Sequence, residues 1–331
     1  MLRRHWLSLP LTLAPFTGAL AAERTLLNAA YDATREFHAD FNAAFARHWR
    51  ALSGEDVALY QSHGGSGAQA RSVLDGLRAD LVSLALPPDI DRLARAGLVD
   101  TRWREALPRQ ACPMASTIVF LVRKGNPHGI RGWDDLLQPR LALVTPNPRI
   151  SGGARWNWFA AWGHALRASG SERAAFDFMR QLFARVPVLD TGARSAAMSF
   201  IVRGMGDVLL AWESEAHLAL QAFGTQAIEL VTPPDSILAL LPVAQVERVT
   251  QRRGSAGLAR AYLDYLYSAD AQQLARRHFF RPAQLPATEL PAVDTFTLEA
   301  VAGDWREAQQ RHFAEGGLFD QIWQPAARRA S

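Results

Sequence analysis

The chain has 331 residues, of which 49% are hydrophobic and 21% charged, with a formal net charge of +4. This length is sufficient for two lobes, because single hydrophobic cores stop growing at about 250–300 residues. The lysines and arginines are scattered, so we expect neither nucleic-acid nor membrane-surface binding. Cys112 is the only cysteine, which excludes an intramolecular disulfide.

Residues 1–21 have the features of a secretory signal peptide. Two arginines precede a mainly apolar stretch over residues 7–20, and Ala19-Leu20-Ala21 supplies the small-x-small pattern that signal peptidase recognises. The apolar run is too short to span a bilayer and is interrupted by two prolines. We therefore expect cleavage near Ala21 or Ala22 and a mature protein that is soluble and exported; the family resemblance described below places it in the periplasm.

Strand-like and helix-like segments alternate along the rest of the chain, which is typical of an α/β protein with a mostly parallel sheet in each lobe. Residues 25–31 read as the first strand, and the helix that follows carries apolar side chains at close to i,i+4 spacing. Residues 116–122 are a β-branched apolar run of the kind found in buried strands. Further strands are expected at 57–62, 80–86, 141–145, 186–189, 207–212, 227–231 and 237–243, and helices at 64–78, 154–168, 171–184, 255–279 and 298–313.

The chain shows neither an internal repeat nor a low-complexity linker, so we expect it to cross between two lobes more than once within ordinary strands. The run at 116–122 is a natural outward crossing, and residues around 241–246 a natural return. The first lobe would then comprise residues 22–115 and 247–331, with the C-terminal tail packed across it. The second lobe would comprise residues 116–246.

Three segments share one pattern, in which a strand is followed by a tight loop of small residues and then a helix. The first backbone N–H groups of a helix have no intrahelical partner, and the helix dipole places about half a positive charge there. Each segment alone is usually only a helix cap or a turn. Three of them at the carboxyl ends of strands predict an anion site, because ligands of open α/β sheets bind at that edge. The segments are Gln61–Gly67, Thr145–Arg155 and Leu189–Ser195.

The alternatives based on other chemistry lack their motifs. There is no phosphate loop of the Gly-x-x-x-x-Gly-Lys type, and Gly204-Met205-Gly206 lacks the third glycine of a dinucleotide fingerprint. Ser66 has no closing glycine to form a nucleophile elbow, and loop support is the simpler role for His63. The histidines are dispersed, without metal-ligand spacing. Trp212 ends an apolar strand, either as a core residue or as an uncharged donor facing a cleft.

The combined motifs resemble the periplasmic sulfate/thiosulfate-binding proteins of bacterial ABC importers. The resemblance extends from about Leu26 to Ile322. It implies a two-lobed periplasmic binding protein fold of type II, with each lobe an α/β unit and the ligand in the cleft between them. The motifs that carry the resemblance are Ser62–Gly67, Ser116–Pro127, Thr145–Pro148 with Ser151–Asn157, and Gly206–Glu213.

The resemblance also implies a set of site residues and partners. The dianion would be held without a contacting cation. Ligand capture would require the lobes to close, because Asp32 and Ser66 lie in the first lobe and the other implied donors in the second. Permease subunits of an ABC importer would be the partners of a monomeric receptor that has no catalytic activity, cofactor or metal. The implied donors are the backbone N–H groups of Asp32, Ser66, Gly152, Gly153 and Ala193, the Ser151 hydroxyl and the Trp212 indole, with His63, Arg155 and Arg194 in support.

Ligand choice stays open between sulfate, thiosulfate and another tetrahedral oxyanion such as molybdate. Ser195-Ala196-Ala197-Met198 departs from the glycine- and threonine-rich stretch of the family and affects the rim of the pocket. A lining made only of donors predicts rejection of phosphate, whose proton needs an acceptor. A hydrolase of sulfate esters or phosphates is the remote alternative, and it would need a nucleophile–base pair or a metal site.

Overall fold

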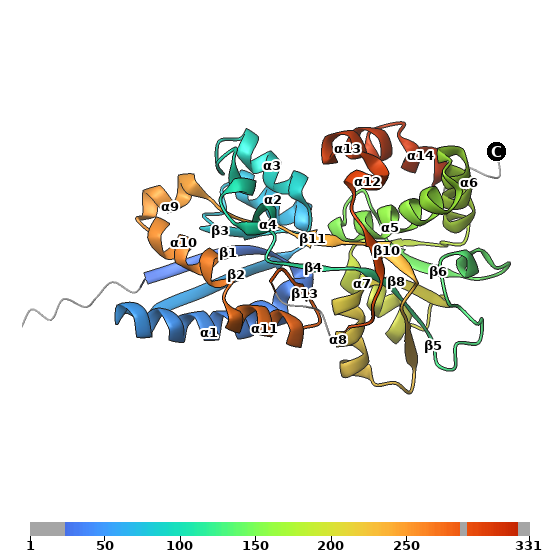
Figure 1. Cartoon of the computed structure of the whole chain (residues 1–331), viewed down its shortest axis with the longest axis horizontal. Helices are drawn as coiled ribbons and strands as arrows, with labels where there is room; N and C mark the ends of the chain where they lie inside the picture. Colours follow the sequence, from blue (N-terminus) through green and yellow to red (C-terminus); the bar gives the residue numbers. More distant parts are fainter. Residues whose placement is uncertain (1–23, 285–289, 324–331) are drawn as a thin grey trace, which may run out of the picture.

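A computed structural model describes residues 24–284 and 290–323 of the chain. The expected signal peptide and its cleavage point lie outside these ranges. Helices and strands of the described chain form two groups that lie side by side along the long axis of the molecule (Figure 1). We call the group that contains the N-terminal strand the first lobe and the other group the second lobe. Within the described ranges, no helix is long and apolar enough to cross a bilayer.

The first lobe is built on a four-stranded sheet with the order β12-β3-β1-β2. The central strand β1 pairs in parallel with β2 and β3, whereas β12 pairs with β3 in the antiparallel direction. The residue pairing brings Tyr31 at the end of β1 beside Gly64 at the end of β2. The loops that follow both strands therefore emerge at one edge of the sheet. The strands are β1 (Arg24–Tyr31), β2 (Val57–Gly64), β3 (Leu81–Ser83) and β12 (Val243–Gln245).

Helices cover the sheet of the first lobe through their apolar faces. In α1, Phe37, Phe41 and Phe45 recur every four residues, lie on one face and are fully buried. The single helix expected over 255–279 is instead two helices, because Ser268 starts a new helix by accepting a hydrogen bond from the backbone N–H of Ala271. The helical segments are η1 (Asp32–Thr34), α1 (Arg35–Ser53), α2 (Ser66–Leu74), α3 (Pro87–Arg95), η2 (Trp103–Glu105), α4 (Pro108–Ala111), α9 (Glu247–Arg253), α10 (Ala256–Tyr265) and α11 (Ala269–Arg277).

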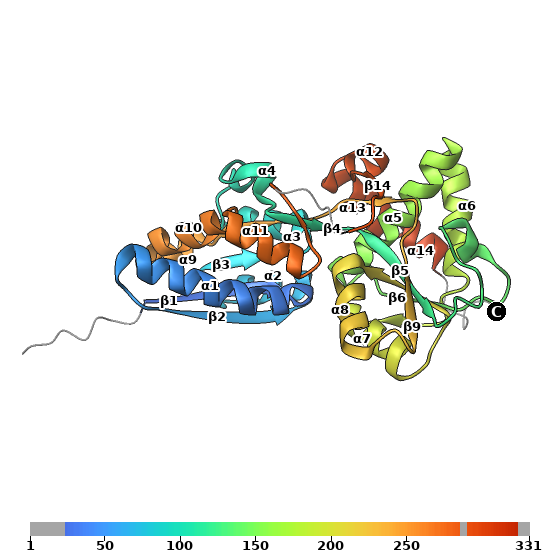
Figure 2. The same ribbon diagram turned by 60° about the horizontal axis from the view of Figure 1, so that its bottom comes forward.

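A small antiparallel sheet with the order β11-β4-β13 lies between the lobes (Figure 1). Its strand β4 is also seen between the lobes in Figure 2. The expected outward crossing at 116–122 is two strands rather than one, interrupted at Thr117, whose hydroxyl donates to the carbonyl of Ile237. Its second part, β5, enters the sheet of the second lobe. The expected strand at 237–243 is likewise divided among three short strands. The elements are β4 (Met114–Ser116), β5 (Ile118–Arg123), β10 (Asp235–Ile237), β11 (Ala239–Leu241) and β13 (Arg281–Pro282).

The second lobe is built on a five-stranded sheet with the order β7-β6-β8-β5-β9. The prediction of a mostly parallel sheet is wrong here, because the incoming strand β5 pairs antiparallel with both of its neighbours. The pairs β6–β7 and β6–β8 are parallel. The elements are η3 (Asp134–Leu137), β6 (Leu143–Pro146), α5 (Gly152–Ser169), α6 (Glu172–Phe183), β7 (Leu189–Asp190), α7 (Ala193–Ala197), the π-helix η4 (Met198–Val202), β8 (Val208–Trp212), α8 (Glu213–Phe223) and β9 (Ile228–Val231).

The C-terminal tail packs on the second lobe, which corrects its expected place on the first. Phe319 lies 5.5 Å from Trp158 of α5 between ring centroids, and Arg311 forms an ion pair with Glu172 of α6. Aromatic side chains of the tail thus pack against those of α5. The tail helices lie beside α5 and α6 in Figure 1. The expected helix at 298–313 is two helices separated at Gly303 and Asp304. The tail elements are β14 (Asp294–Phe296), α12 (Glu299–Ala302), α13 (Trp305–Phe313) and α14 (Leu318–Ile322).

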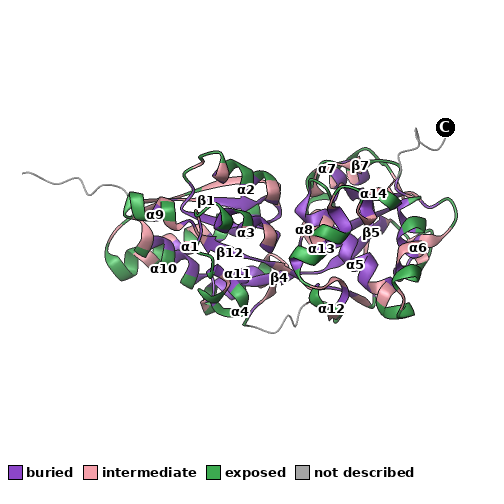
Figure 3. Cartoon of the chain, turned by 90° about the horizontal axis from the view of Figure 1, so that it is seen from above, coloured by how far each residue is buried: buried purple, intermediate pink, exposed green. Residues whose placement is uncertain are grey.

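Each lobe has buried segments at its centre, with exposed helical faces around them (Figure 3). The strands β5 and β8 are buried along almost their whole length, and β1 is buried in its second half. Rigid sheets therefore carry the loops that face the boundary between the lobes, and these loops contain the three predicted helix starts.

Candidate functional site

The three predicted helix starts lie where the lobes face one another. Ser66 begins α2 directly after β2, Gly152 begins α5 after β6, and Ala193 begins α7 after β7. A cavity of about 270 Å³ receives residues from all three loops and from the end of β1. Residues from distant parts of the chain, with uncommitted helical N–H groups among them, thus meet around one space. The cavity is lined by Tyr31, Asp32, Ala33, Gly65, Ser151, Thr191, Gly192, Ala193, Arg194, Ser195 and Glu215.

On the first-lobe side, the hydroxyl of Ser66 is already engaged inside the protein. It donates to Asp89 at 2.6 Å and accepts from the backbone N–H of Ala85 at 3.1 Å, and Ser66 is completely buried. Its backbone N–H is in the first turn of α2 and has no intrahelical acceptor. The side chain of Ser66 therefore fixes the position of the loop, and its backbone N–H is left without an intrahelical acceptor.

On the second-lobe side, Ser151 caps α5. Its Oγ accepts a hydrogen bond from the backbone N–H of Ala154 at 3.3 Å, and its own backbone N–H is bonded to the carbonyl of Asn147 at 2.9 Å. A hydroxyl that accepts through oxygen still has its proton to donate. Gly152 and Gly153 follow as the first residues of the helix, where N–H groups lack partners.

Trp212 ends β8 and is buried beside the same helix start. Its indole Nε1 donates to the carbonyl of Gly153 at 3.3 Å, and its ring lies 5.4 Å from that of Tyr31. A narrow adjoining space is lined by Trp212, Gly153 and Ala193 among others. The indole is thus close to two predicted donors, and its own N–H is directed at a backbone carbonyl in this structure.

The two lobes touch at the helix starts. A Cβ placed on Gly152 would lie 3.0 Å from the Cβ of Ser66 and 3.2 Å from that of Ala85, both in the first lobe. The indole of Trp156 in α5 also donates to the carbonyl of Ala85 at 2.8 Å. The second-lobe helix therefore meets the first lobe through a glycine, at a place where an added Cβ would make tighter contacts than usual.

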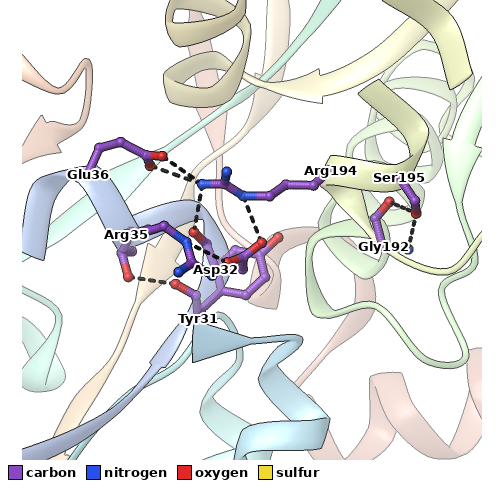
Figure 4. A network of polar contacts seen from close by, with 8 residues as sticks. Tyr31, Asp32, Arg35, Glu36, Gly192, Arg194 and Ser195 are labelled. Carbon is purple, nitrogen blue, oxygen red and sulfur yellow. Dashed lines mark hydrogen bonds and ion pairs between the residues drawn. The ribbon is translucent and has the colours of Figure 1, made fainter. Parts of the chain in front are cut away.

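Arg194 links the lobes at the rim of the cavity (Figure 4). Its Nε lies 2.7 Å from the carboxylate of Asp32, and its Nη2 donates to Glu36 at 2.8 Å. Both carboxylates belong to the first lobe, whereas Arg194 follows the helix start at Ala193. The guanidinium is occupied by these carboxylates.

Arg155 and His63, the other predicted supporting residues, lie next to the site. The Arg155 guanidinium donates to the carbonyl of Pro148 at 2.8 Å and to Gln309 at 2.9 Å, which ties the first turn of α5 to its preceding loop and to α13. His63 is the second-to-last residue of β2, and burial lowers the pKa of its imidazole. Among the described residues, its buried Nε2 has no hydrogen-bond partner.

Two residues of the cavity were missed from the sequence. Tyr31 presents a buried Oη without a hydrogen-bond partner in the described chain, close to Gly153. Glu215 lies one turn after Trp212 in α8, a spacing that could have drawn attention to it. Burial raises the pKa of Glu215 to about 7, with Arg194 opposing and the charges of Asp32 and Glu36 adding to the rise.

Glu215 and Asp32 correct the expectation that the cavity is lined by donors alone, since both carry carboxyl groups. The Asp32 carboxylate is neutralised by Arg35 and Arg194. The raised pKa of Glu215 means that a substantial fraction of it is protonated, and thus a donor, near neutral pH. Across the described part of the chain, no group of three or more His, Cys, Asp or Glu side chains is arranged to hold a metal ion.

Residues 26–281 match the model of the family described as bacterial extracellular solute-binding protein. The chain belongs to this family. It is 47% identical to the sulfate-binding protein of Salmonella typhimurium over 92% of this chain and 95% of that protein. It is also 43% identical to the thiosulfate-binding protein of Pseudomonas aeruginosa over 93% of this chain and 95% of that protein.

Solved structures agree with this assignment. The sulfate-binding protein SubI from Mycobacterium tuberculosis superimposes with a TM-score of 0.78 at 32% identity, covering 88% of this chain and all of SubI. The periplasmic binding protein AfuA from Actinobacillus pleuropneumoniae has a TM-score of 0.60 at 16% identity, covering 87% of this chain and 93% of AfuA, a likeness of fold alone. These matches confirm the predicted two-lobed binding protein fold of type II.

Proposed function

We propose that this chain is the solute-binding component of an ABC importer, and that it captures sulfate or thiosulfate between its lobes in the periplasm. One observation carries the proposal: a cavity between the lobes is lined by residues of three helix starts, in a chain 47% identical to a sulfate-binding protein. We expect it to act as a monomer, to deliver the anion to membrane permease subunits, and to catalyse no reaction.

The proposed grip on the anion uses uncharged donors. Each hydrogen bond to a charged group contributes about 1.5–3 kcal/mol net, so seven would contribute roughly 10–20 kcal/mol before the costs of desolvation and closure. An affinity of about 1 μM, equivalent to about −8 kcal/mol, is within this range. The proposed donors are the backbone N–H groups of Asp32, Ser66, Gly152, Gly153 and Ala193, the Ser151 hydroxyl and the Trp212 indole.

Calorimetric titration of exhaustively dialysed protein tests the proposal. Sulfate, thiosulfate, molybdate and phosphate are each titrated at neutral pH. We expect micromolar or tighter binding of sulfate or thiosulfate. We expect weak binding of phosphate, because its proton needs an acceptor, whereas the Asp32 carboxylate is paired with Arg35 and Arg194 and burial raises the pKa of Glu215 to about 7. Exclusive binding of molybdate, or tight binding of phosphate with none of the sulfur oxyanions, would contradict the proposal.

A further inference from the structure

A second hollow adjoins the anion cavity at Ser151, which lines both spaces. It has a volume of about 660 Å³, and its walls come from both lobes. We call it the arginine groove, because five arginines line it and only two carboxylates, those of Asp75 and Asp89, accompany them. The arginines are Arg71 on α2, Arg92 and Arg95 on α3, Arg149 before α5, and Arg155 in α5.

The first-lobe arginines of this groove are less compensated than the second-lobe ones, although Arg92 interacts electrostatically with the carboxyl group of Asp89. Arg149 forms an ion pair with Asp320, and Arg155 is bonded to Gln309 and to backbone carbonyls. By contrast, Arg71, Arg92 and Arg95 are exposed, and the described parts of the chain supply neither an ion pair nor a hydrogen bond to their guanidinium groups. The groove thus has an excess of uncompensated positive charge.

The partition between the groove and the anion cavity is a contact between the lobes. On its second-lobe side stands Gly152, and on its first-lobe side stand Ser66, Ala85 and Leu86, each within 3.2 Å of where a Cβ on Gly152 would be. Separation of the lobes at this contact would join the groove and the cavity into one cleft. In an open receptor, the arginines therefore line a wall of the cleft that leads to the helix starts.

We propose that the arginine groove is the entry vestibule of the anion site, which attracts a divalent oxyanion into the open cleft before the lobes close on it. This inference rests on the proposed function, because it takes a sulfur oxyanion as the ligand. Oriented charge at the mouth of a cleft raises association rates by about 10–10³-fold, and salt screens the effect over about 8 Å at physiological ionic strength. The arginines accelerate capture, whereas the uncharged donors hold the captured anion.

Charge reversal of the groove tests the inference. The double variant Arg92→Glu with Arg95→Glu changes the charge by −4 without touching a proposed donor. The matched control, Arg47→Glu with Arg131→Glu, makes the same change at two exposed arginines that lie outside the groove, one in each lobe. Association and dissociation of sulfate are followed by stopped-flow tryptophan fluorescence at about 10 mM and about 300 mM sodium chloride, where the screening lengths are about 30 Å and below 8 Å.

At low salt we expect the groove variant to associate at least tenfold more slowly than the wild type, and the control less than threefold more slowly. The difference shrinks at high salt, and dissociation rates stay within twofold. Equal slowing in both variants, or a change confined to dissociation, overturns the inference. If the groove variant does not fold, the milder Arg92→Gln with Arg95→Gln variant is used, and an unchanged low-salt rate overturns the inference. If wild-type protein binds no sulfate in calorimetry, the proposed function fails instead.

Discussion

The contact between Gly152 and the first lobe makes closure sensitive to a single methyl group. In Gly152→Ala, the added carbon would lie 3.0 Å from the Cβ of Ser66 and 3.2 Å from the Cβ of Ala85. Carbon atoms pack at about 3.5–4.0 Å, so the two lobes must give way at this contact by a few tenths of an ångström before they can close. Both neighbouring carbons are attached directly to the backbone and cannot rotate away. Alanine keeps the backbone N–H of residue 152. Any loss of affinity therefore comes from incomplete closure of the lobes and not from a missing hydrogen-bond donor.

The expected loss follows from the donors that closure brings to the anion. Asp32 and Ser66 are the proposed first-lobe donors, and two charge-assisted hydrogen bonds are worth about 3–6 kcal/mol together. At about 1.4 kcal/mol per tenfold change, the affinity for sulfate falls by about 100-fold to 10⁴-fold. The free energy of unfolding changes by no more than about 1 kcal/mol, because a glycine in the first turn of a helix tolerates alanine.

Calorimetry measures the affinity, and thermal unfolding checks that the variant is folded. Gly257→Ala is the matched control, because Gly257 also lies in the first turn of a helix, α10, and no atom lies within 4 Å of its added Cβ. The control should bind sulfate as the wild type does. Small-angle scattering should show the usual compaction on adding sulfate for the control and a smaller one for Gly152→Ala. If Gly152→Ala binds sulfate within threefold of the wild type, the steric reasoning is refuted.

Three further predictions concern single residues. Trp212→Phe removes the indole N–H and should weaken sulfate binding by about 10–150-fold in calorimetry, equivalent to about 1.5–3 kcal/mol. An unchanged affinity would show that the indole donates only to the carbonyl of Gly153. Glu36→Gln removes one carboxylate partner of the half-exposed Arg194, so the affinity for sulfate should fall less than about fivefold at low salt and be unchanged at high salt. A large loss of sulfate affinity at high salt would contradict this. Burial lowers the pKa of His312 to about 3 in the folded protein, whereas a histidine in the unfolded chain has a pKa of about 6.5. As the pH falls below about 6.5, only the unfolded chain takes up this proton, so the free energy of unfolding decreases. Urea unfolding should therefore show that the free energy of unfolding falls by about 2 kcal/mol less for His312→Gln than for the wild type between pH 7 and pH 5. An equal fall in both proteins would show that His312 does not take up a proton on unfolding.

Local features of the fold could be predicted because they depend on short stretches of sequence. The four-residue spacing of Phe37, Phe41 and Phe45 is enough to define the buried face of α1. The glycines and serines after β2 and β6 are enough to define two helix starts with unpaired N–H groups. The strands at 25–31 and 207–212 were also predicted almost to their observed ends.

Long-range pairing was beyond these local rules. The antiparallel entry of β5 depends on which strands it meets, and the tail packs on α5 because Phe319 meets Trp158 across more than 150 residues of sequence. Neither partner is specified by periodicity, which states only that a face is apolar.

The sequence by itself determined that this protein presents several uncharged helix starts suited to an anion, because N–H groups in a first helical turn are left unpaired by local geometry alone. Only the tertiary structure decided what surrounds them. Folding brings Glu215 and Tyr31 into the same cavity, presses Gly152 closely against the first lobe, and lines the neighbouring groove with arginines from both lobes. These properties depend on distances between residues far apart in the chain, which are fixed by packing and closure rather than by any one segment.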